Sequence, residues 1–125
     1  MHTILAVVDD LFFASKMRGT GEQVGAQVRF VKSIPHALSK ARDEAPVLLI
    51  VDLNAGCCDA AELARAFKAD ENLKAIPLLG FFSHVQTELQ QAALAAGFDR
   101  VMPRSAFAKH LAEILGGDGE SVPPA

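Results

Sequence analysis

The stretch that decides the fold is residues 47–54, VLLIVDLN, in which five consecutive apolar residues run directly into a carboxylate. An apolar run of this length after Pro46, rich in β-branched residues, predicts a strand buried on both faces, as in the centre of a parallel sheet. In open α/β sheets, ligands bind beyond the carboxyl ends of the strands. Asp52, which closes this strand, is therefore a candidate functional residue.

The amino-terminal stretch repeats this pattern. Residues 3–8, TILAVV, form a second apolar run, and Asp9 and Asp10 follow it. If the two strands are neighbours, three carboxylates lie in one patch, where like charges raise one another's pKa unless a cation compensates. A set of oxygen ligands suits a hard cation, most simply Mg²⁺. The structural alternative is that each of the two N-terminal acids caps the following helix.

Length and composition indicate one globular domain. The chain has 125 residues, half of them apolar, and no apolar run long enough to span a membrane. A net charge of −3 offers no basic face for nucleic acid, and two adjacent cysteines make no disulfide framework. No signal-peptide pattern precedes the first strand. We therefore expect a cytoplasmic domain over residues 1–116 that binds neither membrane nor nucleic acid, followed by a disordered tail over residues 117–125.

Strand and helix patterns alternate along the whole chain. Further strands are predicted at residues 27–31, 77–82 and 100–102, and helices follow each strand. Ser33, Asp59 and Ser83 stand where helix N-caps are expected, the last two as capping boxes. These five strand–helix units predict an α/β fold, a doubly wound, five-stranded parallel sheet with five helices. By analogy with known flavodoxin-like folds, we expect the strand order 2-1-3-4-5. That order places the acids of the first and third strands together.

With these acids and this order of elements, the chain resembles the receiver domain of response regulators (CheY-like) over residues 3–115. The resemblance implies that Asp52 is the phosphoacceptor. It also implies that Asp9, Asp10 and Asp52 bind Mg²⁺ with their side chains, and that Asn54 contributes its backbone carbonyl to the same ion.

Other positions depart from the receiver pattern and suggest an atypical or pseudo-receiver variant. Phe82 stands where receivers have a hydroxyl residue, and Val101 stands at their aromatic switch position. Ser83 could replace that hydroxyl, although we favour its role as a helix cap. Arg104 replaces the lysine and can still pair with a phosphoryl group. Ser105 replaces the proline that follows, so the Arg104–Ser105 bond is predicted to be trans.

The resemblance predicts a stand-alone receiver domain of a two-component phosphorelay that is not an enzyme. A sensor histidine kinase or phosphotransfer protein would donate the phosphoryl group to Asp52, and a downstream protein of unknown identity would respond. One alternative is a phosphorylation-independent pseudo-receiver that acts as a protein-interaction module. A small Mg²⁺-dependent phosphatase is a further alternative, but no separate acid–base residue supports it. A redox role for Cys57 and Cys58 is disfavoured, because nearby carboxylates would raise the pKa of the thiols.

Overall fold

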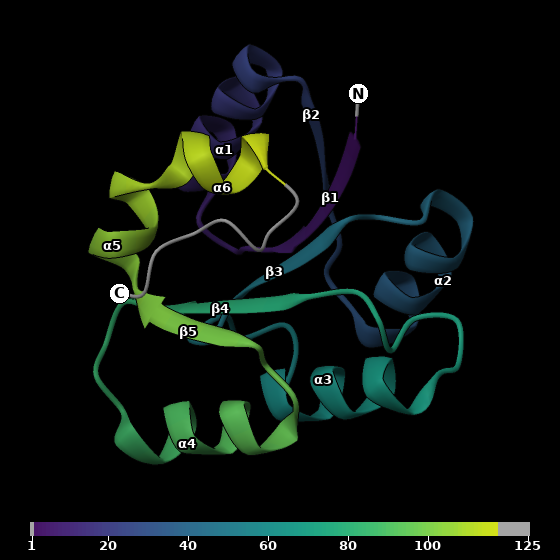
Figure 1. Ribbon diagram of the computed structural model, residues 1–125. Helices are drawn as coiled ribbons and strands as arrows, with labels where there is room; N and C mark the ends of the chain where they lie inside the picture. Colours follow the sequence, from purple (N-terminus) through teal and green to yellow (C-terminus); the bar gives the residue numbers. More distant parts are fainter. Residues whose placement is uncertain (1, 118–125) are drawn as a thin grey trace.

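The computed structural model describes residues 2–117, which form a parallel sheet between two layers of helices (Figure 1). The strands are β1 (His2–Val7), β2 (Ala26–Phe30), β3 (Leu48–Asp52), β4 (Leu78–Phe82) and β5 (Arg100–Pro103). All neighbouring strands are parallel, in the order β2-β1-β3-β4-β5. The predicted doubly wound sheet and its strand order are therefore confirmed.

Six helices connect or follow these strands within residues 2–117. They are α1 (Leu11–Val24), α2 (Ile34–Glu44), α3 (Ala60–Ala69), α4 (Thr87–Ala96), α5 (Arg104–Lys109) and α6 (Leu111–Gly116). The prediction of five helices differs at the carboxyl end, where the expected last helix is divided. His110 separates α5 from α6 because its backbone leaves the helical conformation, with φ of −103° and ψ of 17°.

The two layers bury opposite faces of the sheet. Helices α1, α5 and α6 cover one face, and α2, α3 and α4 cover the other (Figure 1). Alternate residues of β1 supply both cores, since Ile4 packs on the first side and Leu5 on the second. Burial on both faces explains why the strands are continuous apolar runs rather than alternating patterns.

An aromatic cluster forms the centre of the core on the α1 side. The rings of Phe81 and Phe107 stack with their centroids 4.6 Å apart. Phe13 of α1 meets Phe81 edge-on at 5.5 Å and lies 5.8 Å from Phe107. This cluster joins α1, β4 and α5 beneath the carboxyl ends of the strands.

Two of the three predicted helix caps are confirmed. The Ser33 hydroxyl accepts a hydrogen bond from the backbone of His36, and the Asp59 carboxylate accepts one from Glu62. The prediction for Ser83 is wrong, because α4 begins at Thr87 and Gln86 occupies its N-cap position without a side-chain cap bond. The backbone after β4 lies instead against the loop that follows β3, where Asn54 accepts hydrogen bonds from the Ser83 and His84 amides.

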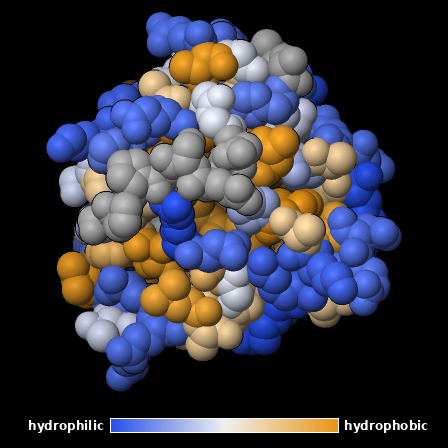
Figure 2. All heavy atoms as spheres, in the orientation of Figure 1, coloured by the Kyte–Doolittle hydropathy of each residue, from blue (hydrophilic) through white to orange (hydrophobic). Residues whose placement is uncertain are grey.

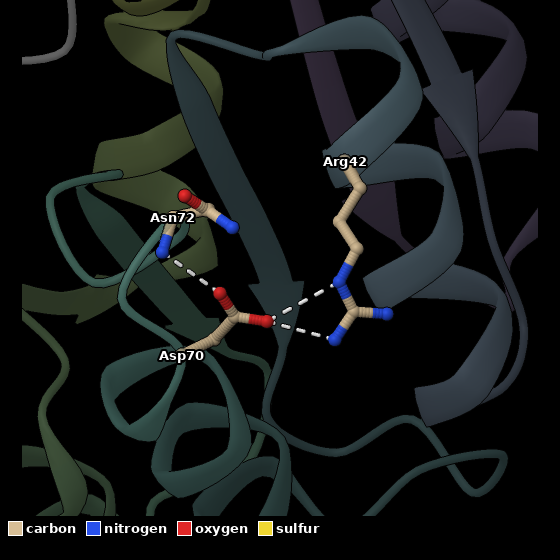
Figure 3. Close-up of polar contacts among 3 residues, drawn as sticks. All are labelled: Arg42, Asp70 and Asn72. Atoms are coloured by element: carbon tan, nitrogen blue, oxygen red, sulfur yellow. Dashed lines mark hydrogen bonds and ion pairs between the residues drawn. The ribbon is translucent and has the colours of Figure 1, made fainter.

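An ion pair holds α2 to the loop that leads into β4 (Figure 3). The Arg42 guanidinium donates to Asp70 Oδ2 at 3.2 and 2.7 Å, and Asp70 Oδ1 accepts from the backbone of Asn72 at 2.8 Å. Arg42 is the main cause that lowers the pKa of Asp70, and the Asn72 bond adds to it. These contacts fix the start of the loop on the side opposite the strand-end acids.

Figure 2 shows hydrophobic residues across the middle of the face seen in Figure 1 and hydrophilic residues around its rim. Within residues 2–117, no helix has both the length and the apolar character needed to cross a membrane. The last described helix, α6, ends at Gly116. The tail predicted to be disordered, apart from Gly117, lies outside the described residues.

Candidate functional site

Three acids meet at the carboxyl end of the central strands. Asp52 closes β3, while Asp9 and Asp10 follow β1, which lies directly beside β3 with Val7 paired to Val51. The pKa of Asp52 is raised, mainly by burial and further by the charges of Asp9 and Asp10. A backbone hydrogen bond from Asn54 and the charge of Arg104 act in the opposite direction. Asp9 and Asp10 are therefore close enough to influence the ionisation of Asp52.

Each acid accepts a hydrogen bond from at least one backbone amide. Asp9 Oδ2 accepts a hydrogen bond from the Gly56 amide at 2.9 Å, and Asp52 Oδ1 accepts one from the Asn54 amide at 2.9 Å. Asp10 Oδ1 accepts from the amides of Phe12 and Phe13, at 2.9 and 3.1 Å. Asp10 therefore caps α1, as the structural alternative held, whereas Asp9 bridges to the loop after β3.

Arg104 supplies the positive charge at this site. Its Nη2 donates to Asp10 Oδ2 at 3.0 Å, with both side chains only partly exposed. Its guanidinium carbon lies 4.2 Å from the centroid of the Phe13 ring, within the range of a cation–π contact. The pKa of Asp10 is lowered, first by the Phe13 backbone hydrogen bond and then by Arg104. No residue pattern in the sequence pointed to Phe13 as the support of this cation.

Asn54 joins the loop after β3 to the loop after β4. Its Oδ1 accepts hydrogen bonds from the amides of Ser83 at 2.8 Å and His84 at 3.2 Å. Its Nδ2 lies 3.5 Å from Gln86 Oε1. The Asn54 side chain is therefore occupied by the loop, which leaves its backbone carbonyl as the group predicted to face a metal ion.

Two of the predicted switch positions are packing residues. Phe82 is 8% exposed and belongs to the core beneath α3 and α4, and Val101 packs against the same core. Ser83 is exposed in the loop, and its hydroxyl is not committed to capping α4. Residues 2–117 contain no cis peptide bond, so the Arg104–Ser105 bond is trans, as predicted.

The two cysteines lie beside the acids in the same loop. Desolvation, and after it the neighbouring Cys58 and Asp9, together raise the pKa of the Cys57 thiol to about 12. A thiol with such a high pKa stays protonated at neutral pH and reacts slowly with oxidants. The raised pKa agrees in direction with the prediction for Cys57, but its main causes are desolvation and Cys58, and the Asp9 carboxylate contributes less.

The ligand types and the charge of the site suit Mg²⁺, but the side chains are not arranged around a single ion position. The oxygens of Asp9, Asp52 and the Asn54 carbonyl are hard ligands. The pKa of Asp52 is raised mainly by burial, and the smaller contribution from the charges of Asp9 and Asp10 is one that a cation would relieve. However, the part of the chain that the structure describes holds no group of three His, Cys, Asp or Glu side chains placed to bind one metal. Asp10 in particular is engaged on both oxygens.

The chain matches no protein family's sequence profile and no curated protein. Its fold is similar to that of many solved structures. The chemotaxis response regulator CheY4 of Vibrio cholerae has a TM-score of 0.78 at 23% identity, with 92% of this chain and 96% of that chain covered. The Mn²⁺-bound response regulator Rcp1 has a TM-score of 0.77 at 16% identity, covering 100% and 99%.

A receiver domain of a sensor histidine kinase from Pseudomonas aeruginosa, with a magnesium ion coordinated in its active-site cleft, gives a TM-score of 0.74 at 18% identity. The match covers 93% of this chain and 98% of that chain. These similarities show that the chain has the fold of response-regulator receiver domains, with the flavodoxin-like strand order predicted from the sequence.

Proposed function

We propose that this protein is the receiver domain of a two-component phosphorelay and accepts a phosphoryl group on Asp52. The observation that carries this proposal is the setting of Asp52. It is a half-buried carboxylate at the carboxyl end of the central strand, with two acids and one guanidinium around it. The fold shared with response-regulator receivers supports the proposal, and so does the topological switch point at which the site lies.

The proposed reaction is a phosphoryl transfer from a phosphohistidine to the Asp52 carboxylate. An oxygen of Asp52 attacks phosphorus, the phosphorus–nitrogen bond breaks, and the imidazole nitrogen leaves with the electron pair of that bond. Asp52 Oδ1 is held by the Asn54 amide, whereas Oδ2 accepts no hydrogen bond from residues 2–117. Oδ2 is therefore the oxygen that we assign as nucleophile.

Arg104 is the residue that would bind the transferred group. A guanidinium carries several N–H donors in one plane and suits the oxygens of a phosphoryl group. Because Arg104 already contacts Asp10 and stacks on Phe13, it is held beside the acids before any phosphoryl group arrives. Ser83, exposed at the start of the loop after β4, is the hydroxyl residue that the receiver pattern offers here.

Mg²⁺ is the cofactor in this proposal, and when bound it neutralises charge on the transferring group. Asp9, Asp52 and the Asn54 carbonyl would hold it, with Asp10 contributing directly or through water. Both oxygens of Asp10 already accept hydrogen bonds, from the start of α1 and from Arg104, so Asp10 would bind the ion through water or after rearrangement. Asp9 accepts a backbone hydrogen bond on Oδ2 only, from Gly56, which leaves Oδ1 for the ion. A Mg²⁺ titration monitored by amide chemical shifts should move Asp9, Asp52 and Asn54 together. Shifts scattered over the surface would contradict a shared site.

The proposed partners are a sensor histidine kinase or a phosphotransfer protein and a downstream protein, which places the domain in the cytoplasm. An apolar edge borders the site: Leu11 and Phe12 follow Asp10 directly and are 76% and 91% exposed. Large apolar side chains in such exposed positions are suited to contact with another protein. A phosphohistidine donor that reaches Asp52 would meet this edge.

Mass spectrometry of the intact protein tests the proposal. After incubation with Mg²⁺ and a small phosphodonor such as acetyl phosphate, the wild-type protein should gain one phosphoryl group. The D52N variant should gain none. Labelling of D52N at the wild-type level would refute the assignment of Asp52, and donor consumption without a stable adduct would indicate an enzyme.

The second candidate function is a phosphorylation-independent pseudo-receiver. The observation that favours it is the burial of Phe82 and the packing of Val101 in the core, since neither can contact a phosphoryl group. In that case neither the wild type nor D52N would be labelled by acetyl phosphate with Mg²⁺, and both would bind the same partner.

A further inference from the structure

A cavity lies at the opposite end of the sheet from the acids. It has a volume of about 290 Å³ and is formed where β3, β4 and β5 begin, next to the end of α3 and the loop before β4. This volume is near the lower limit of small-molecule sites. The cavity shares no residue with the site around Asp52, so an inference about it is independent of the proposed function.

Positive charge dominates the lining of this cavity. Three cationic side chains, Lys68, Lys74 and Arg100, face one carboxylate, Asp99. Asp99 Oδ2 already accepts a hydrogen bond from the Leu78 amide at 2.8 Å, so the start of β4 holds this carboxylate in place. The formal balance of the lining is therefore positive, although the net charge of the whole chain is −3.

The ammonium of Lys68 is held at the cavity by its surroundings. Lys68 Nζ lies 3.3 Å from the Lys74 carbonyl oxygen and 3.6 Å from Asp99 Oδ2, a distance too long for a good hydrogen bond. Gly97 lets the stem of Lys68 pass close by, because a Cβ at Gly97 would lie 2.8 Å from Lys68 Cγ. Lys68 is thus positioned with donor capacity that the protein leaves largely unused.

Lys74 is the second cation available to a ligand. Its ammonium pairs with Glu71 at 2.9 Å, but the Glu71 side chain is 85% exposed. Exposed pairs of this kind are weak because water and salt screen them. An anion between Lys74 and Lys68 can therefore compete for the Lys74 ammonium.

The accessible apolar surface of the cavity comes from Ala75 and Pro77 in the loop before β4. Leu48, Leu78 and Leu79 also line the cavity, but each is only 1% exposed, so their side chains belong to the core behind it. We propose that this cavity binds a small organic anion that has a carboxylate or phosphate head and a compact apolar body. The head pairs with Lys68 and Lys74, and the body covers Ala75 and Pro77.

Chemical-shift titrations with benzoate and phenyl phosphate test this site, and benzamide serves as the uncharged probe of similar shape. We expect saturable shifts of the amides of Lys74, Leu78 and Arg100 with at least one of the two anions. Benzamide should bind about tenfold more weakly or worse, because it lacks the charge. Inorganic phosphate should also bind more weakly, because it lacks the apolar body.

Variants of the two lysines provide the decisive comparison. Lys68→Gln and Lys74→Gln should each weaken binding of the anion about tenfold, while Lys32→Gln, an exposed lysine after β2, should leave it unchanged. Unchanged wild-type spectral dispersion would show that the variants fold. The proposal is overturned if the anions cause no saturable shifts at the cavity, if benzamide or inorganic phosphate binds as well as they do, or if all three variants bind alike.

Discussion

Arg104 and Asp10 form an ion pair at 3.0 Å that crosses from the start of α5 to the start of α1, and the guanidinium rests on the ring of Phe13. This pair places a resident cation among the strand-end acids. It also occupies Asp10, one of the carboxylates that the receiver resemblance assigns to Mg²⁺. In the proposed function, the same contact would hold the phosphoryl-binding Arg104 near Asp52 and would compete with Mg²⁺ for Asp10.

Removal of this charge should strengthen Mg²⁺ binding. In R104M the apolar stem remains, but the positive charge and the hydrogen bond to Asp10 are lost, so the affinity for Mg²⁺ should rise about tenfold. R18M is the matched control, because Arg18 also lies over a phenylalanine ring, with its guanidinium carbon 5.1 Å from the centroid of Phe30. Arg18 lies about two helical turns beyond Asp10 in α1, away from the acids, so R18M should leave the affinity for Mg²⁺ unchanged. Calorimetric titration measures both. An R104M affinity equal to or below that of the wild type would show that Arg104 does not compete with the ion.

Asp52 should make stability depend on pH in a defined direction. Its pKa is raised in the folded protein, so the folded state binds more protons than the unfolded state between the unfolded and folded pKa values. The contribution of Asp52 to stability is therefore lost as pH rises through this window, and the ionised form destabilises the fold at neutral pH. D52N should be more stable than the wild type at pH 7, with the difference shrinking below about pH 4. Urea unfolding at both pH values measures this, and a constant difference would contradict it.

The loop after β4 should depend on Asn54 and not on the Ser83 hydroxyl. N54A removes the acceptor of the Ser83 and His84 amides, so their hydrogen exchange should become about tenfold faster. S83A should change the free energy of unfolding by less than about 0.5 kcal/mol. Loss of a true helix cap would cost about 1 kcal/mol, and a loss of that size in S83A would restore the capping assignment.

Gly80 controls the position of the residue between Asp52 and Asn54. A Cβ at Gly80 would lie 2.9 Å from Leu53 Cδ2, so G80A must displace the Leu53 side chain. We expect a loss of about 1–3 kcal/mol in stability, together with slower phosphorylation of Asp52. G19A is the control, because nothing lies within 4 Å of its new Cβ on α1. It should stabilise the helix by up to about 1 kcal/mol. Equal effects of G80A and G19A in urea unfolding would exclude the steric role of Leu53.

Truncation to alanine should destabilise the fold much more in the aromatic core, at Phe107, than at the exposed apolar edge beside the site, at Phe12. F107A empties a fully buried position that stacks on Phe81 and should cost about 3–5 kcal/mol. F12A removes a side chain that is 91% exposed and should change stability by less than about 0.5 kcal/mol. Urea unfolding with equal m-values measures both. A loss in F12A comparable to that in F107A would show that Phe12 is packed in solution.

The sequence by itself determined the architecture. The continuous apolar runs that end at Val8 and Val51 can only be strands buried on both faces, and strands of this kind, separated by helices, build a doubly wound sheet. The strand order then follows from the right-handed crossovers and the family resemblance, so the placement of Asp9, Asp10 and Asp52 at one end of the sheet was predictable. Local helix caps at Ser33 and Asp59 were predictable for the same reason, since each bond spans only three residues.

Tertiary structure decided what the side chains at that end do. Asn54 draws the amides of Ser83 and His84 toward itself across about thirty residues of sequence, and this long-range bond overrides the local signal for a cap at Ser83. Arg104 and Asp10 are 94 positions apart in the sequence, and no periodicity or spacing predicts that their side chains pair. The physical reason is that local hydrogen bonds depend on neighbours in the chain. The partners of a charge or an amide at a sheet edge depend instead on which loops the folded sheet brings together.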